Sequence, residues 1–182
     1  MKKHLLLIIL SLAFISLNGQ NLNLGVKFQK THSLYWENGI SAQYSFKTFK
    51  PDQFYIGFDY VTSRLGSAFS SNAIKQDNIV ASIAWHFRKN KPFRIITELN
   101  FGITKADLEE EIFSDLPSSA KILAPEVGVA YNFKNYPVVA NLGFGFNINV
   151  GNGGESPGTQ QPLFYHLALY YQFPQNQKID EE

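Results

Sequence analysis

The sequence of 182 residues contains no cysteine. Disulfide bonds, thiolate metal sites and a lipid-modified amino-terminal cysteine are therefore excluded. Charged residues are scarce at 17%, and basic and acidic residues nearly balance, with a formal net charge of +1. Because proteins that bind nucleic acid carry a basic face, this balance argues against a nucleic-acid partner.

The sequence also has no apolar run of the about 20 residues that a transmembrane helix needs. Its first residues, "MKKH", are basic and precede the thirteen-residue apolar run "LLLIILSLAFISL". Gly19 then offers a small residue for cleavage before Gln20. This order is typical of a secretory signal peptide over residues 1–19. A retained amino-terminal anchor is the alternative interpretation.

What the chain does have is an alternation of apolar and polar residues with a period of two. In "VVANLGFGFNINV", residues 138–150, the even positions are apolar, whereas the odd positions after Val139 are Asn or Gly. Successive side chains of a β-strand point to opposite faces, so this pattern predicts a strand. Seven other segments follow the same pattern: residues 22–29, 40–47, 54–61, 79–88, 93–102, 126–133 and 163–173.

Eight alternating strands in one domain predict an all-β fold, an antiparallel up-and-down barrel. The stretch "FKNY" predicts a two-residue hairpin turn at Lys134 and Asn135, which pairs Phe133 with Tyr136. Counting outward from this turn places apolar residues opposite apolar residues, so the faces of the two strands agree.

The apolar face is expected to point outward, as in a transmembrane barrel, rather than inward, as in a soluble lipocalin-like barrel. Its residues carry no charge, whereas the other face is rich in the small residues that suit a narrow lumen. The long connections, residues 30–39, 63–78, 104–121 and 151–162, alternate with short turns, as in outer-membrane barrels.

Aromatic residues of the apolar face gather beside the short turns, which predicts the aromatic girdle of a membrane interface. A thinner girdle is expected at the opposite end, near Phe28, Tyr60, Phe101 and Tyr165. The girdle at the short turns comprises Phe46, Phe54, Trp85, Phe87, Phe93, Tyr131, Phe133, Tyr136, Tyr171 and Phe173.

With this architecture the chain resembles the small eight-stranded outer-membrane proteins of Gram-negative bacteria, of the OmpX or OmpA-barrel type. The resemblance covers the chain from Leu22 to Phe173 and rests on the strand pattern and the closing strand, "HLALYYQF". It implies export to the outer membrane, contact with outer-membrane lipid and lipopolysaccharide, and a carboxy-terminal signal read by the barrel-assembly machinery. The residues at the signal positions are His166, Ala168, Tyr171 and Phe173, with Ala168 in place of the usual glycine.

The expected organisation is a signal peptide over residues 1–19, a barrel over residues 20–173 and a short periplasmic tail over residues 174–182. On the polar face we expect an internal network of charged residues that plugs the lumen, since unpaired buried charge is costly. A narrow path for ions or small solutes is the alternative. The network comprises Lys27, Asp59, His86, Arg88, Arg94, Glu98, Glu126 and His166.

An enzyme is not expected, and neither is a cofactor, a metal site or a catalytic residue. A lipid-modifying enzyme, which is the last alternative, would need a histidine on the lipid face, and none falls there; His32, beside Ser33, lies in the first long connection. The acidic residues at positions 107, 109–111 and 115 do not have the ligand spacing of an EF-hand.

We therefore expect a structural or interaction role, in which the exposed connections contact an extracellular partner, or the chain contacts a periplasmic one. A narrow channel and an accessory barrel of a secretion or assembly pathway remain as alternatives.

Overall fold

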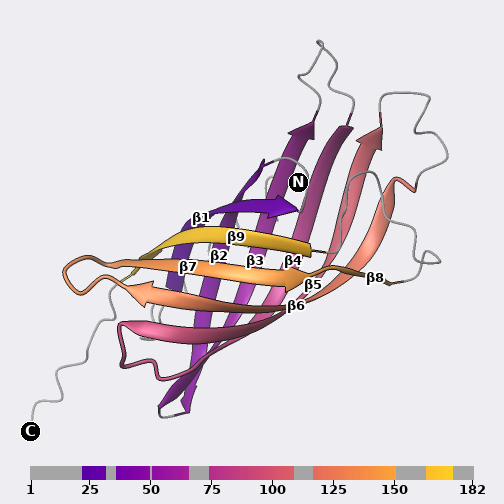
Figure 1. Cartoon of the computed structure of the whole chain (residues 1–182). Coiled ribbons are helices and arrows are strands. Elements are labelled where there is room, and N and C mark those ends of the chain that lie inside the picture. The colour runs from indigo at the N-terminus through magenta and orange to yellow at the C-terminus, as the bar shows by residue number, and fades with distance from the viewer. Residues whose placement is uncertain are drawn as a thin grey trace, which may run out of the picture.

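The computed structural model describes residues 22–31, 36–49, 51–65, 74–108, 117–150 and 163–173, and the side chains of residues 46–49, 64–65, 74 and 108 fall outside this description. Figure 1 shows the strands tilted around a common axis as a barrel. Among the described residues no helix is long and apolar enough to cross a membrane. The strand segments are β1 (Leu22–Thr31), β2 (Trp36–Phe49), β3 (Asp52–Leu65), β4 (Ile74–His86), β5 (Phe93–Leu108), β6 (Ser119–Asn132), β7 (Val138–Phe146), β8 (Ile148–Val150) and β9 (Leu163–Gln172).

The nine segments make eight barrel strands, because β7 and β8 are two parts of one strand. Both pair with β6, and the pairs Glu126–Gly145 and Leu123–Ile148 belong to the same register. The strand is interrupted at Asn147, which the register places opposite Ala124 of β6. The next residue of β6, Pro125, has no N–H group to donate to the ladder. Each strand pairs with its sequence neighbour, and β9 closes the barrel on β1. The predicted eight-stranded antiparallel up-and-down barrel is confirmed.

The strands are strongly staggered around the barrel. A path of register partners that starts at Val138 returns to the same strand at Ile148, ten residues further along. A stagger of this kind tilts the strands by about 35–45° to the barrel axis. The path passes through Tyr171, Leu24, Ala42, Phe58, Ala81, Phe101 and Leu123.

The apolar face points outward, as predicted. Ile40, Leu142 and Phe93 are 64%, 55% and 58% exposed, whereas the lumen-facing Ser41 and Asn141 are 3% and 4% exposed. Thirty large apolar or aromatic side chains of the described residues are exposed in this way. A soluble protein rarely exposes so large a continuous apolar surface, so the barrel wall is built for contact with lipid.

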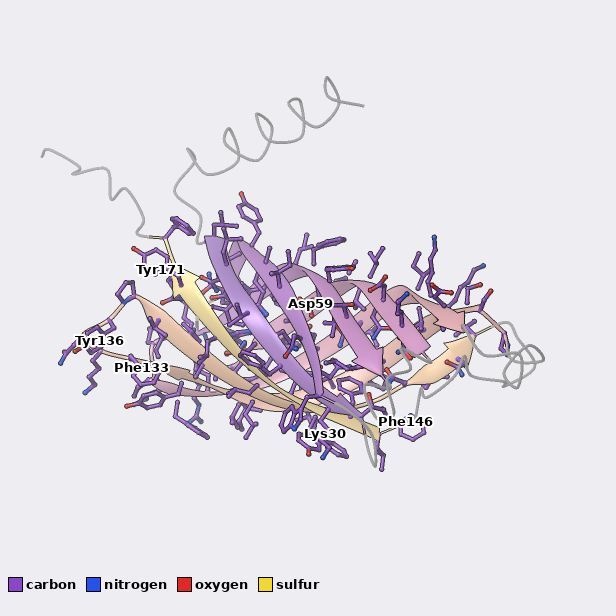
Figure 2. All side chains as sticks on the ribbon, turned by 90° about the horizontal axis from the view of Figure 1, so that it is seen from above. Lys30, Asp59, Phe133, Tyr136, Phe146 and Tyr171 are labelled. Atoms are coloured by element: carbon purple, nitrogen blue, oxygen red, sulfur yellow. The ribbon has the colours of Figure 1, made fainter. Side chains whose placement is uncertain are left out.

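Aromatic side chains pack against one another at the end of the barrel with the short turns. The rings of Trp85 and Phe87 stack with centroids 4.9 Å apart, and Tyr171 and Phe173 meet edge to face at 5.1 Å. Figure 2 shows Phe133, Tyr136 and Tyr171 at this end. Phe46 of β2 is also a predicted member of this girdle, but its side chain lies outside the described residues.

The predicted register of the β6–β7 hairpin is wrong by two residues. Tyr131 pairs with Ala140 instead of Val138, and Val129 pairs with Leu142. The loop is longer than predicted, because Phe133 donates its N–H to the carbonyl of Val138 and Pro137 has no N–H to pair. A shift of two residues preserves the alternation, so the assignment of the faces is unaffected.

Several strands are longer than predicted. β5 continues to Leu108 and β6 begins at Ser119, within a segment predicted as a connection. Beyond the apolar belt the outward residues become polar, as at Lys105 and Lys121, while the inward residues include Ala106 and Ile122. Both β5 and β6 therefore continue beyond the belt, although here the polar residues face outward and apolar residues face the lumen. β2 likewise begins at Trp36, which was assigned to a connection.

Replacing Leu142 by Arg tests which face contacts lipid. Leu142 faces outward near the middle of the apolar belt, so Leu142→Arg should lower the free energy of unfolding by about 2–4 kcal/mol. Denaturant unfolding in lipid vesicles, followed by the fluorescence of Trp36 and Trp85, gives this quantity. The matched control is Asn135→Arg in the exposed β6–β7 turn, where the same charge should have little effect. Equal stability of the two variants would contradict the assignment.

Candidate functional site

The centre of the lumen holds a buried ion pair. Lys27 Nζ of β1 lies 2.6 Å from Asp59 Oδ2 of β3, and both residues are buried. The hydroxyl of Ser41 donates to the second carboxylate oxygen of Asp59 and lies 2.8 Å from the hydroxyl of Tyr170. Figure 2 shows Asp59 about midway between the two ends of the barrel. The ion pair and its two hydroxyl neighbours thus link four adjacent strands, β3, β2, β1 and β9, on one side of the lumen.

Two further carboxylates face the lumen from neighbouring strands. Glu98 of β5 and Glu126 of β6 are register partners, so two carboxyl groups lie directly opposite each other. The Asn100 amide donates to Glu126 Oε2 over 3.3 Å, and His166 Nδ1 of β9 lies 3.4 Å from Glu126 Oε1. Ser82 lies beside Glu98. Lys27 also lies near both glutamates.

The close packing of this cluster depends on a glycine. A Cβ atom on Gly143 of β7 would overlap the Glu126 carboxylate and the His166 ring. The absence of a side chain at this position therefore makes room for both groups inside the narrow barrel.

His86 and Arg94 lie nearer the short-turn end and do not contact the central ion pair. The ring of His86 packs against Tyr55 with centroids 4.3 Å apart, and Arg94 lies beside both residues. Arg94 Nε donates to the carbonyl of Lys91 over 3.1 Å. These residues form a second polar group rather than part of one continuous network.

Arg88 is not in the lumen, contrary to the prediction. It lies in the β4–β5 turn, where it is exposed, has a positive φ of 54° and donates its backbone N–H to Asp52 Oδ1. Strand β4 ends at His86, and the alternation that placed Arg88 inward stops there.

An apolar cluster fills the lumen at the short-turn end. Sequence reasoning did not predict this plug, although it placed Tyr55, Val139 and Tyr170 on the inward face. The sequence feature that could have indicated the plug is the presence of these large side chains among the small residues of the inward face. The cluster comprises Tyr55, Ala84, Ile96, Ala130, Val139, Ala168 and Tyr170, each at most 4% exposed.

Toward the other end, the lumen is polar and holds a small cavity. The cavity has a volume of about 30 Å³ and is lined by amide side chains, among them Gln76, Asn78 and Asn100. This space suits about one water molecule. Within the described ranges, no group of three or more His, Asp and Glu side chains is arranged to hold a metal ion.

The positions proposed for the assembly signal lie on both faces of β9. His166 and Ala168 are buried in the lumen, and Tyr171 and Phe173 are exposed on the outer face. His32, Ser33, residues 109–116, the signal peptide and the tail lie outside the described residues. Asp107 is exposed on β5, with its carboxylate 3.9 Å from Lys75 Nζ.

Comparison with protein-family models gives no match, and comparison with curated proteins gives none either. Among solved structures, the chain is similar to the amino-terminal β-barrel domain of OprF from Pseudomonas aeruginosa, with a TM-score of 0.61, 13% identity, and coverage of 84% of this chain and 97% of that one. Neisserial surface protein A gives a TM-score of 0.53 with 15% identity, covering 86% of this chain and 98% of that one. Ail of Yersinia pestis gives 0.52 with 16% identity, covering 85% and 99%. The chain therefore has the fold of a small outer-membrane β-barrel.

Removing the lumen cation should destabilise the barrel. Lys27→Met leaves Asp59 buried without its partner, so the free energy of unfolding should fall by about 3–5 kcal/mol. Denaturant unfolding in vesicles measures the loss. Lys30→Gln is the control on the same strand, because Lys30 faces outward over the Trp36 ring at 5.6 Å and should contribute about 1 kcal/mol or less. A Lys27→Met barrel as stable as the control would show that the ion pair contributes little.

Proposed function

We propose that this protein is a closed barrel of the outer membrane whose role is structural or interactive, performed by its exposed end rather than by its lumen. The observation that carries this proposal is the combination of an outward apolar belt with a lumen filled at two levels. The belt requires lipid contact, and the filled lumen leaves no wide path for solute.

Location in the outer membrane rests on three features. The fold is that of outer-membrane barrels, the aromatic girdle lies beside the short turns, and the amino-terminal segment has the pattern of a signal peptide. In this orientation the short turns face the periplasm, and the long connections face outward. The tail at residues 174–182 would then follow β9 into the periplasm.

The lumen supports a structural role more strongly than a channel. The apolar plug occupies the periplasmic half, and the Lys27–Asp59 pair lies on one side of the lumen near its middle. The charged residues inside the barrel act, in this proposal, as packing groups that hold nearby strands together.

The exposed end is the surface that would contact a partner. The similar barrel Ail is described in complex with the heparin analogue sucrose octasulfate, with a TM-score of 0.51 and 15% identity to this chain. For the present protein we infer only that its outward end contacts molecules of the cell surface or its surroundings. An accessory role in secretion or assembly would instead require a protein partner that co-purifies with the barrel.

We also propose that β9 carries the signal for assembly. Tyr171 and Phe173 project from the outer face next to the periplasmic end, where the rings contact each other and remain exposed. Such a pair is accessible to the barrel-assembly machinery before the barrel closes. His166 and Ala168 would act by fitting the lumen rather than by contact with that machinery.

A conductance measurement separates the closed barrel from the channel. The purified protein in planar bilayers should give no steady conductance, because the apolar plug blocks the lumen. A variant with Tyr55→Ala and Tyr170→Ala, which removes the two largest rings of the plug, should conduct if it folds to the same compact form. Steady conductance by the unaltered protein would favour the channel.

Cysteine labelling tests the orientation, since the chain has no cysteine of its own. Ser118→Cys, at an exposed position beside a long connection, should react with a membrane-impermeant maleimide on intact cells. Asn135→Cys, in the exposed β6–β7 turn, should react only after the outer membrane is permeabilised. The opposite pattern would mean that the barrel is inverted in the membrane.

A further inference from the structure

The lumen mouth at the short-turn end contains a cation that no carboxylate of the described residues offsets. Arg94 of β5 faces inward and is 6% exposed, and its Nε–H donates to the carbonyl of Lys91 over 3.1 Å. None of the ion pairs among the described residues includes Arg94. Glu98, on the same face of β5, lies about 13 Å further along the strand. Ile96 of the apolar plug lies between the two residues.

A buried cation is costly unless an anion offsets its charge. Lys27 at the centre of the lumen meets this requirement, because the carboxylate of Asp59 lies 2.6 Å from its Nζ atom. The Lys91 carbonyl and the Tyr55 hydroxyl, which lie beside Arg94, are neutral. The environment of Arg94 is therefore incomplete without an anion.

Other buried polar groups of this mouth also lack partners. Both ring nitrogens of His86, and the amide oxygens of Asn23 and Asn132, have no hydrogen-bond partner among the described residues. His86 and Asn23 are each 2% exposed. Both lie beside Tyr55, as Arg94 does, so polar groups from β1, β4 and β5 converge here. Buried donors and acceptors are ordinarily satisfied, so this convergence indicates a site for a polar ligand.

The short turns form a continuous rim that separates this mouth from the lipid wall. Three backbone N–H groups donate to the carbonyls of turn prolines over 2.8 Å: Lys89 to Pro51, Asn132 to Pro92 and Gln172 to Pro137. These bonds join neighbouring turns and strand ends, so a lipid on the outer wall does not reach a group that faces inward. A ligand of Arg94 therefore enters along the barrel axis, from the side of the short turns.

Cations surround the mouth. Arg88 and Lys91 are exposed in the β4–β5 turn, and Lys134 is exposed in the β6–β7 turn. Asp52 is the carboxylate of the described short turns, and it accepts the backbone N–H of Arg88 over 2.9 Å. Positive charge thus exceeds negative charge at this end, and such a field attracts an anionic partner.

We propose that this mouth binds an acidic peptide segment of a periplasmic protein, with one carboxylate on the Arg94 guanidinium. A planar guanidinium binds a carboxylate through two parallel N–H···O bonds. The peptide also has backbone N–H groups that the amide oxygens of Asn23 and Asn132 can accept. The periplasmic location rests on the proposed orientation of the barrel. The site adds a contact at the end opposite the outward one, to which the proposed function assigns interaction.

Titration with a defined peptide tests the site. The refolded protein in zwitterionic detergent is added to rhodamine-labelled hexaglutamate, and fluorescence anisotropy gives the Kd. Arg94→Gln should weaken binding about tenfold or more, because it removes charge-assisted hydrogen bonds. Arg94→Lys keeps the charge without the planar fork and should lose a smaller part of the affinity. The matched control on the same strand, Lys105→Gln, removes a cation at the opposite end and should leave the Kd unchanged.

Unfolding by urea separates a binding role of Arg94 from a structural one. Removal of a buried charge that has no partner should not destabilise the barrel, so Arg94→Gln should unfold at the same or a higher urea concentration than the unaltered protein. Lys27→Met removes one partner of an ion pair and should unfold at a lower concentration. An Arg94→Gln barrel as unstable as Lys27→Met would assign a structural role to Arg94 and overturn the site.

Three outcomes of the titration would also overturn the proposal. Equal affinity of Arg94→Gln and the unaltered protein would exclude Arg94. Displacement of the peptide by succinate at an equal concentration of carboxylate would identify the ligand as a small free carboxylate. Displacement by phosphatidylglycerol added to the micelles would identify it as an anionic lipid. Heat-dependent gel migration confirms that each variant is folded. Reversed labelling of the two cysteine variants, with peptide binding intact, would contradict the proposed orientation rather than the site.

Discussion

The pairing of β9 with β1 is the constraint on which the rest of the structure depends. Lipid offers no hydrogen-bond partner, so a sheet that crosses a membrane must satisfy every backbone group within itself and leave no free edge. Closure of eight strands with a stagger of ten residues meets this requirement. It also gives each strand one face toward lipid and one toward a narrow lumen. The apolar wall and the packed interior both follow from closure.

The narrow lumen explains how its side chains are chosen. Near the short turns, Tyr55, Ile96 and Tyr170 belong to the apolar plug, and the ring of Tyr55 also packs against His86. At the centre, Lys27 of β1 and Asp59 of β3 connect two strands that flank β2, and Gly143 provides room for Glu126 and His166. Ion pairing inside the barrel offsets the cost of buried charge. A lumen filled in this way leaves the outer wall and the exposed end as the surfaces available for contact.

Much of this fold could be predicted from a single sequence, because alternation with a period of two survives any shift of two residues. The lipid face was assigned correctly although the predicted register of the β6–β7 hairpin was wrong by two residues. The length of β5 and β6 was underestimated because the outward pattern becomes polar beyond the belt, at Lys105 and Lys121. The division of the lumen into an apolar plug and an ionic centre depends on which side chains meet across the barrel. That in turn depends on the stagger of the closed sheet, which no local pattern contains.

A barrel closed by hydrogen bonds between its first and last strands should resist detergent until it is heated. The most direct measurement is therefore the gel migration of the full chain in the outer-membrane fraction, with and without boiling. The closed transmembrane barrel predicts a compact, fast-migrating species that changes to the mobility of the unfolded chain on boiling. A protein recovered entirely in the soluble periplasmic fraction, with the same migration in both samples, would contradict it.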